Sequence, residues 1–193
     1  MNYYKITNEK ENHNGLQYQD GVITDVIPFN PSGDCAPGGI YFIREDIFAY
    51  LSYGPWIRRV ELLEDSLVYE NPGSPKKWKA DKVFLHSRRE INLDVIKELV
   101  REGANIHAYN DEALRWAAEK GHLKIVKFLV ENGANIYAND DFALRYAAEK
   151  GYLEIVKFLC EKGADIHALG DEALRCAAEN GHLEVTEFLS KKI

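Results

Sequence analysis

Apolar residues recur along the second half of the chain with the spacing of amphipathic helices, and the whole pattern repeats. The segment Asp111–Asn139 is followed thirty residues later by a near copy, Asp141–Leu169, and a third copy starts at Asp171. In each copy a first apolar stripe ends at an Ala-Ala pair, and a longer apolar stretch follows a glycine. A fixed period of about 20 to 50 residues is typical of stacked repeats. The pattern therefore predicts helix–turn–helix units that bury their apolar surface by stacking on one another.

The first copy shows what each unit is expected to contain. Asp111 is the expected N-cap of a first helix, with its carboxylate accepting a hydrogen bond from the first turn. Arg115 stands four residues further on and is expected to pair with that carboxylate. Gly121 is expected to end the helix in the left-handed conformation. The second helix, 123–132, has only a narrow polar stripe, which indicates a helix packed between neighbours.

The motifs of the copies resemble the ankyrin repeat. An Ala-Ala pair recurs in all three copies, a Gly-His pair in the first and third, with Tyr152 in place of the histidine in the second, and a closing Gly-Ala in the first two, as in AAEKGH and VENGANI. The resemblance covers 91–193 and implies a half repeat at 91–108, followed by repeats at 109–138, 139–168 and 169–193. The common ankyrin repeat has about 33 residues, so a period of 30 implies shorter hairpin fingers between the repeats. This short form resembles the ankyrin proteins of giant, mimivirus-like DNA viruses of amoebae.

The first ninety residues have a different pattern and hold all six prolines. Asp20-Gly21 between two apolar runs predicts a hairpin. Residues 40–42 are expected to form a buried strand, and 44–54 an amphipathic helix. Two further strands are expected at 56–63 and 78–85. The chain is therefore predicted to have a small α+β N-terminal domain at 1–90, which caps the half repeat, and an all-α ankyrin-repeat solenoid at 91–193.

Two motifs of this N-terminal part are similar to the domain that often precedes such viral repeats. They are Gly15-Leu16-Gln17-Tyr18 and the segment 37–42, PGGIYF. This similarity implies an organisation and no chemistry.

Composition and charge narrow the classes of function. The chain has 193 residues, of which 46% are hydrophobic, and no apolar run approaches the roughly 18 residues of a membrane span. Its N-terminus lacks the features of a signal peptide. A net charge of -7 disfavours nucleic-acid binding, which needs clustered Lys and Arg. The three cysteines, Cys35, Cys160 and Cys176, are far apart, which favours a reducing intracellular compartment. We expect a monomer in the host cytoplasm, with a virion location as the alternative.

The positions at which the copies differ indicate where a partner binds. The resemblance implies a groove made by the first helices and the fingers, which binds a protein partner. Trp116, Tyr146 and Cys176 precede the Ala-Ala pairs and are expected to stand in a row, although Trp116 could instead pack against a neighbouring helix or the N-terminal domain. Neighbouring glutamates would make the groove acidic and favour a basic partner segment. The candidate partner-binding residues are Tyr109, Glu112, Trp116, Glu119, Asn139, Phe142, Tyr146, Glu149, Leu169 and Cys176.

An enzymatic N-terminal domain is the alternative function. His13 to Leu16 followed by GGIYF resembles ADP-ribosyltransferases, which implies that His13 and Tyr41 hold a nicotinamide ribose. Glu70 or Glu90 would then orient the acceptor, and the repeats would recruit the substrate. A purely structural or decoy role in a virus particle is a third possibility.

Metal and cofactor sites are not expected. No His or Cys pair has the spacing of metal ligands. His122 and His182 occupy the Gly-His position, where ankyrin histidines hydrogen-bond between loops. Cys160 and Cys176 are expected to be small packing residues rather than nucleophiles. No metal or cofactor site is therefore predicted.

Overall fold

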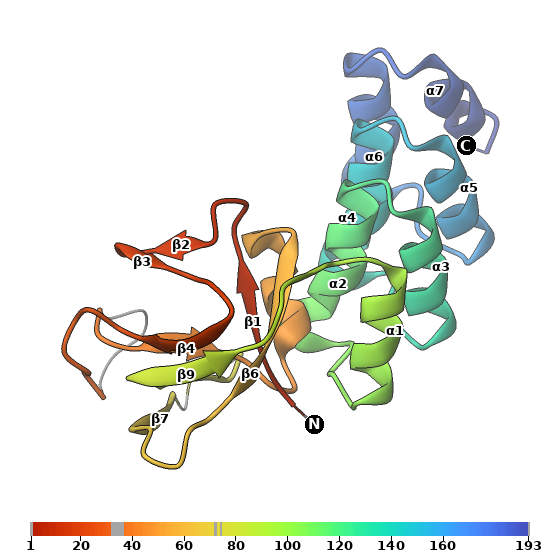
Figure 1. Cartoon of the computed structure of the whole chain (residues 1–193). Helices are drawn as coiled ribbons and strands as arrows, with labels where there is room; N and C mark the ends of the chain where they lie inside the picture. Colours follow the sequence, from red (N-terminus) through yellow and green to blue (C-terminus); the bar gives the residue numbers. More distant parts are fainter. Residues whose placement is uncertain (1, 32–36, 72, 74, 193) are drawn as a thin grey trace. The chain divides into compact units, whose positions relative to one another are not determined.

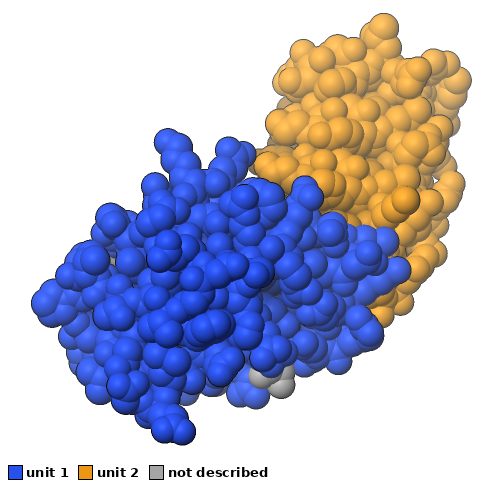
Figure 2. Space-filling view, in the orientation of Figure 1, with its two compact units in different colours: residues 1–109 blue, residues 110–193 orange. Residues whose placement is uncertain are grey.

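The computed structural model describes residues 2–31, 37–71, 73 and 75–192, so Cys35 lies outside the described residues. The chain forms two compact units, Met1–Tyr109 and Asn110–Ile193 (Figure 2). The first unit is strand-rich and the second is helical. None of the helices in the described ranges is long and apolar enough to span a membrane.

Two antiparallel sheets form most of the first unit (Figure 1). The larger sheet has the order β1-β6-β9-β4, with β10 also paired to β6. Its strands are β1 (Tyr3–Thr7), β4 (Gly21–Thr24), β6 (Trp56–Glu61), β9 (Lys82–Leu85) and β10 (Arg89–Glu90). The smaller sheet has the order β5-β8-β7, formed by β5 (Ile40–Phe42), β7 (Val68–Asn71) and β8 (Lys77–Ala80). A separate short pair, β2 (Asn12–His13) and β3 (Leu16–Gln17), forms a hairpin.

Apolar side chains from both sheets make one core. Phe42 and Ile40 of β5, Val83 and Leu85 of β9, and Val60 of β6 belong to a single buried cluster. Burial of such side chains contributes about 1.5–3 kcal/mol each, which explains why short strands assemble into a stable unit.

One local prediction for this unit is wrong, and two others are right only in part. The predicted hairpin at Asp20-Gly21 does not form, because β3 pairs with β2 while β4 pairs with β9. The predicted amphipathic helix is a 3-10 helix, η1 (Ile47–Tyr53). The predicted strand at 78–85 is two strands, because Asp81 makes a turn between them in which its Oδ1 accepts from the amides of Leu67 and Lys82, each at 2.8 Å.

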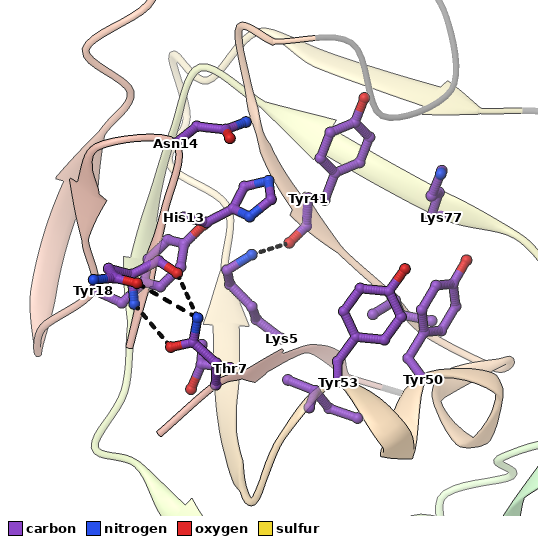
Figure 3. Close-up of a pocket in the computed structure, with 13 residues that line it drawn as sticks. Lys5, Thr7, His13, Asn14, Tyr18, Tyr41, Tyr50, Tyr53 and Lys77 are labelled. Carbon is purple, nitrogen blue, oxygen red and sulfur yellow. Dashed lines mark hydrogen bonds between the residues drawn. The ribbon is translucent and has the colours of Figure 1, made fainter. Parts of the chain in front are cut away.

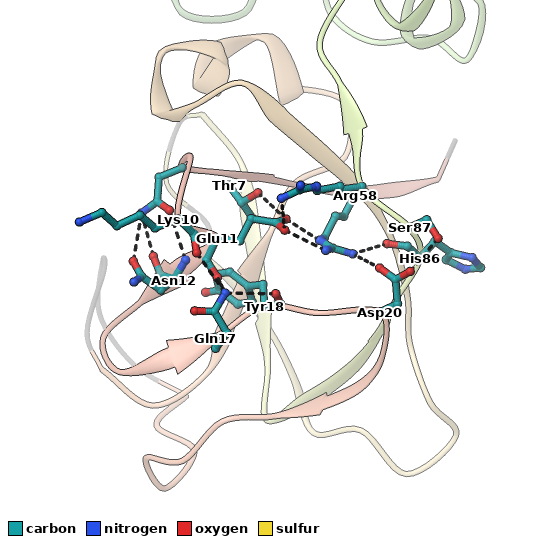
Figure 4. Close-up of polar contacts among 12 residues, drawn as sticks. Thr7, Lys10, Glu11, Asn12, Gln17, Tyr18, Asp20, Arg58, His86 and Ser87 are labelled. Carbon is teal, nitrogen blue, oxygen red and sulfur yellow. Dashed lines mark hydrogen bonds and ion pairs between the residues drawn. The ribbon is translucent and has the colours of Figure 1, made fainter.

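A buried ion-pair network connects β6 to the loops around the larger sheet (Figure 4). Arg58 is 3% exposed and donates from Nε and Nη2 to the two carboxylate oxygens of Glu11, at 2.7 and 3.0 Å. Its Nη1 donates to Asp20 at 2.5 Å and to the carbonyl of His86 at 2.8 Å. These hydrogen bonds and ion pairs compensate the free-energy cost of burying the charged guanidinium of Arg58.

The predicted half repeat packs within the first unit. Its helix α1 (Leu93–Arg101) starts at Asn92, whose side chain accepts from the amides of Asp94 and Val95. Glu102 accepts hydrogen bonds from Asn2 and from the Tyr4 hydroxyl, the latter at 3.0 Å. The sequence pattern changes near Glu90, whereas the compact unit extends to Tyr109 and so includes the half repeat.

Six helices in pairs make up the three copies: α2 (Ala108–Glu119) and α3 (Leu123–Glu131), α4 (Ala138–Glu149) and α5 (Leu153–Glu161), α6 (Ala168–Glu179) and α7 (Leu183–Ser190). The predicted two-helix unit is thus confirmed. In the second unit α4 packs against α6, and α5 against both α3 and α7 (Figure 1). Ala117 and Ala147 are fully buried, since a methyl group lets the next helix approach closely.

The first helix of each copy begins with a left-handed turn that the sequence did not indicate. Three successive residues have positive φ in each copy, at 109–111, 139–141 and 169–171. The N-cap prediction is wrong for Asp141, because its Oδ1 accepts at 2.8 Å from the amide of Asp165, in the exit loop of the same copy. Asp111 makes the same bond to the amide of Asn135.

The Asp–Arg pairs of the second and third copies differ from the prediction. Arg145 pairs with Glu172 of the next copy at 2.5 Å instead of with Asp141. In the third copy Asp171 contacts His167 at 2.7 Å. Asp111 and Asp141 therefore hold the loop that ends their own copy, while Arg145 connects the second copy to the third.

Candidate functional site

The row of residues that precede the Ala-Ala pairs is unevenly accessible. Trp116 is 7% exposed, and its ring centroid lies 5.1 Å from that of His122. Tyr146 and Cys176 are partly exposed. Among these three residues, Tyr146 therefore offers the accessible aromatic surface.

Two aromatic rings stack on α4, the first helix of the second copy. The rings of Phe142 and Tyr146, one turn apart on α4, are 3.9 Å apart at an angle of 12°. The guanidinium carbons of Arg115 and Arg145 lie 5.1 and 5.7 Å from the centre of the Phe142 ring. Cation–π contacts contribute about 0.5–1 kcal/mol when exposed and about 2 kcal/mol when desolvated, and the side chains of Arg115 and Arg145 are only 11% and 13% exposed. We name Arg115, Phe142, Arg145 and Tyr146 the aromatic patch.

The glutamates predicted to make the groove acidic have basic neighbours in the first two copies. Glu112 forms an ion pair with Arg115, and burial raises the pKa of Glu112 above its usual range. Glu119 and Glu149 pair with the adjacent lysines at 3.0 and 2.7 Å. In the third copy the residue after Glu179 is Asn180. The negative charge is thus least compensated on the third copy.

The predicted finger residues lie at the left-handed turns. Tyr109, in the first unit, is 62% exposed, and Leu169 is 55% exposed. Asn139 is exposed, and its Oδ1 accepts from the Nδ2 of Asn110 at 3.4 Å. Tyr137, which the sequence did not single out, is 55% exposed at the end of an exit loop. Its signal was available, because this position differs between the copies (His107, Tyr137, His167).

The cysteines do not have the environment of nucleophiles. Burial raises the pKa of both the Cys160 and Cys176 thiols, so the protonated form dominates at neutral pH. No cluster of three or more metal-ligating side chains occurs in the described part of the chain.

The residues of the enzymatic alternative are only partly brought together. His13 and Tyr41 line one cavity in the first unit (Figure 3). Glu70 is exposed and lies 3.5 Å from Lys76, and neither Glu70 nor Glu90 lines that cavity. The cavity thus contains the two residues proposed to hold a ribose, without the glutamate.

Comparison with known families identifies the class of the repeats. A model of three ankyrin repeats matches residues 70–140, and a model of many ankyrin repeats matches residues 144–189. The chain belongs to the ankyrin repeat family, which confirms the resemblance in the sequence.

Its relatives include several proteins of Acanthamoeba polyphaga mimivirus. One that is named as an ankyrin repeat protein is 38% identical over 135 residues, which cover 62% of this chain and 44% of the relative. A second, also so named, is 34% identical over 127 residues, 63% of this chain and 62% of its own length. An uncharacterized protein of the same virus is 36% identical over 126 residues and is matched over 91% of its length. The chain therefore spans about half the length of the first two relatives.

Proposed function

We propose that the repeats form a solenoid that binds a protein partner through the first-helix face and the adjoining turns. Ankyrin repeats are generally protein-interaction modules, and the aromatic patch gives this array a surface of the composition that anchors protein interfaces. Interface energy is concentrated in a few aromatic and arginine side chains, and the patch combines two of each. The mechanism is noncovalent recognition, with the finger residues at the margin of the contact.

The observation that carries this proposal is that the copies differ in sequence at the position of Phe142, while the alanines that pack one copy against the next stay the same. The position of Phe142 holds glutamate in the other copies, Glu112 and Glu172. The residues that stack the copies, such as Ala117 and Ala147, do not vary and are fully buried. Phe142 and Tyr146 are partly exposed, and variation at such positions over constant buried alanines is expected of a binding surface.

The charge of the array favours a basic partner segment. The chain carries a net charge of -7, and Glu179 on the third copy has no lysine next to it in sequence. A partner that lies across the patch toward α6 would bring its basic residues near this glutamate, and the complementarity would speed association. We propose a monomeric chain that meets this partner in the host cytoplasm.

The copies themselves supply the variants for the test. Phe142→Glu and Tyr146→Cys introduce residues that other copies already hold at these positions, so the fold tolerates them. A partner is first identified by affinity capture from amoebal lysate and then produced alone for calorimetry. The double variant should weaken its binding by tenfold or more.

The control variant is Lys127→Glu, which changes an exposed residue of α3 to the residue found at the matching position of the third copy, Glu187. Its binding should equal that of the wild type. If the double variant binds as tightly as the control, the aromatic patch is not the binding site.

The alternative, an ADP-ribosyltransferase-like first unit, is supported by the common cavity of His13 and Tyr41. Calorimetry with NAD tests it, and a lack of binding at millimolar concentration would exclude it.

A further inference from the structure

A cavity of about 310 Å³ lies within the first unit (Figure 3). Its wall is strongly aromatic, and Lys5 and Lys77 also line it. The cavity volume is at the small end of the range for ligand sites, which run from about 300 to 1,000 Å³. The four tyrosines of the wall are Tyr18, Tyr41, Tyr50 and Tyr53.

Lys5 is the unusual group of this cavity. The residue is 7% exposed, and its ammonium donates to the carbonyl of Tyr41 at 2.9 Å. The ammonium also lies 4.4 Å from the centre of the Tyr18 ring. Of three possible donors, one thus has an oxygen acceptor among the residues that the structure describes.

No carboxylate of the described residues forms an ion pair with Lys5. Asp25 is the acidic residue whose charge acts on Lys5. Its two carboxylate oxygens already accept hydrogen bonds from the amides of Ile27 and Gly39, at 3.1 and 2.6 Å. Among the described residues, no aspartate or glutamate lines the cavity. Burying an unpaired cation is costly, so its presence beside an open cavity calls for an anion that comes from outside the chain.

The walls define the rest of the ligand. Tyr50 and Tyr53 both project from η1, with ring centres 5.7 Å apart, and Figure 3 shows both beside the cavity. The ammonium of Lys77 lies 5.2 Å from the Tyr41 ring and adds positive charge. Such surfaces favour flat apolar rings, which bury area against the tyrosines.

We propose that this cavity binds a small planar aromatic molecule that carries one carboxylate or phosphate group, with the anionic group on Lys5 and the ring against the tyrosines. The acid group replaces the missing counter-ion of Lys5, and Lys77 adds a second basic group to the lining of the cavity. Asn14 also lines the cavity, and its side-chain amide is suited to a polar substituent of the ring, whereas the amide group of Asn8 is already bonded to Asn12.

Protonation of Lys5 makes this binding dependent on pH. Burial lowers the pKa of Lys5 to about 7, partly offset by Asp25. The other titratable groups that line the cavity are His13, Tyr18, Tyr41 and Lys77, together with Tyr50 and Tyr53. An anion binds the ammonium form, so its affinity should fall about tenfold for each pH unit above 7.

Four probes test the proposal on the full chain by calorimetry at pH 6. Phenyl phosphate and benzoate carry both a ring and a charge, phenol carries only the ring, and inorganic phosphate only the charge. At least one of the first two should bind ten times more tightly than phenol and inorganic phosphate. The stronger of the two identifies the acid group as phosphate or carboxylate.

Lys5→Met should abolish this preference, while the control Lys10→Met, an exposed lysine that does not line the cavity, should leave it unchanged. The signal of Lys5 Nζ in NMR spectra of the wild type gives a second measurement that needs no variant, because an anion should raise its pKa. The proposal is overturned if neither charged ring binds below 10 mM, if phenol binds equally well, or if the Lys5 pKa does not move.

Discussion

The imidazole of His182 lies directly over Gly151 of the preceding copy, so close that a Cβ at this glycine would collide with the ring. Its Nε2 contacts the carbonyl oxygen of Glu149 at 2.8 Å, which confirms the predicted hydrogen bond between loops. Tyr152 lies over Gly121 in the same manner one copy earlier. The Gly-His position thus connects consecutive copies by packing a ring on a bare backbone.

Gly151→Ala should therefore destabilise the repeats by about 2–4 kcal/mol. The strained backbone, with a φ of +77°, accounts for about 1–2 kcal/mol, and displacement of His182 adds the remainder. Urea denaturation followed by circular dichroism measures the loss. The matched control is Gly181→Ala, where φ is +74° and no atom lies within 4 Å of the added methyl group. Equal losses for the two variants would show that the contact with His182 contributes nothing.

The buried pair of Arg58 and Glu11 gives a second prediction, for the first unit. Arg58→Met leaves a carboxylate that is 5% exposed without its bidentate partner. Removing one member of a buried ion pair typically costs about 3–5 kcal/mol. The double variant Arg58→Met, Glu11→Gln should recover part of this loss, since no charge is then buried. A double variant that is less stable than Arg58→Met would contradict the argument.

Because Lys5 is buried, the free energy of unfolding should depend on pH. Because burial lowers its pKa from 10.5 to about 7, the unfolded chain binds more protons than the folded chain between these values. Lys5 therefore lowers stability fully below pH 7, and this effect fades as the pH rises toward 10.5. Lys5→Met should increase the free energy of unfolding by about 2–4 kcal/mol at pH 6, and by progressively less above pH 7. Urea titrations at pH 6 and 9 measure both values, and a gain that does not shrink would refute the prediction.

The hydrogen bond from the Asp165 amide to Asp141 gives a prediction for the loop that ends the second copy. Asp141→Ala removes the acceptor of the Asp165 amide and places alanine at a φ of +56°, and should cost about 2–3 kcal/mol. Asp141→Asn keeps an acceptor oxygen and should cost less than about 1 kcal/mol. Asp140→Ala changes an exposed residue at a φ of +55° and measures the backbone contribution alone. An Asp141→Ala variant no less stable than Asp140→Ala would show that the loop needs no carboxylate.

The repeats could be predicted from the sequence because each copy imposes the same stacking requirements on its neighbours. The helices and their closing glycines, such as Gly121 and Gly151, follow from that periodicity. The left-handed turns could not be predicted, because Asn, Asp, Tyr and Leu occupy positive φ there with a glycine only at Gly170. The partner residues themselves remain a prediction.

The strand-rich unit was harder to predict because its pairings are distant in sequence. Gly21 of β4 pairs with Leu85 of β9, so a local hairpin signal was misleading. The cavity brings together residues from 5 to 77, which no local motif connects. One signal was present: Lys5 interrupts the otherwise apolar start of the strand Tyr3–Thr7.

Leu169 offers a prediction in which stability and binding should change in opposite directions. This residue is 55% exposed and has a φ of +51°, where leucine is strained, whereas the second copy holds Asn139 at the same position. Leu169→Asn should raise the free energy of unfolding by about 0.5–1 kcal/mol, because asparagine tolerates the left-handed conformation. If Leu169 also belongs to the partner-binding surface, the same variant should bind the partner more weakly while being more stable. Leu183→Asn, which changes a leucine that is 79% exposed at the start of α7, is the control and should not increase stability. Weaker binding by a more stable chain cannot come from partial unfolding, so this result would assign Leu169 to the interface.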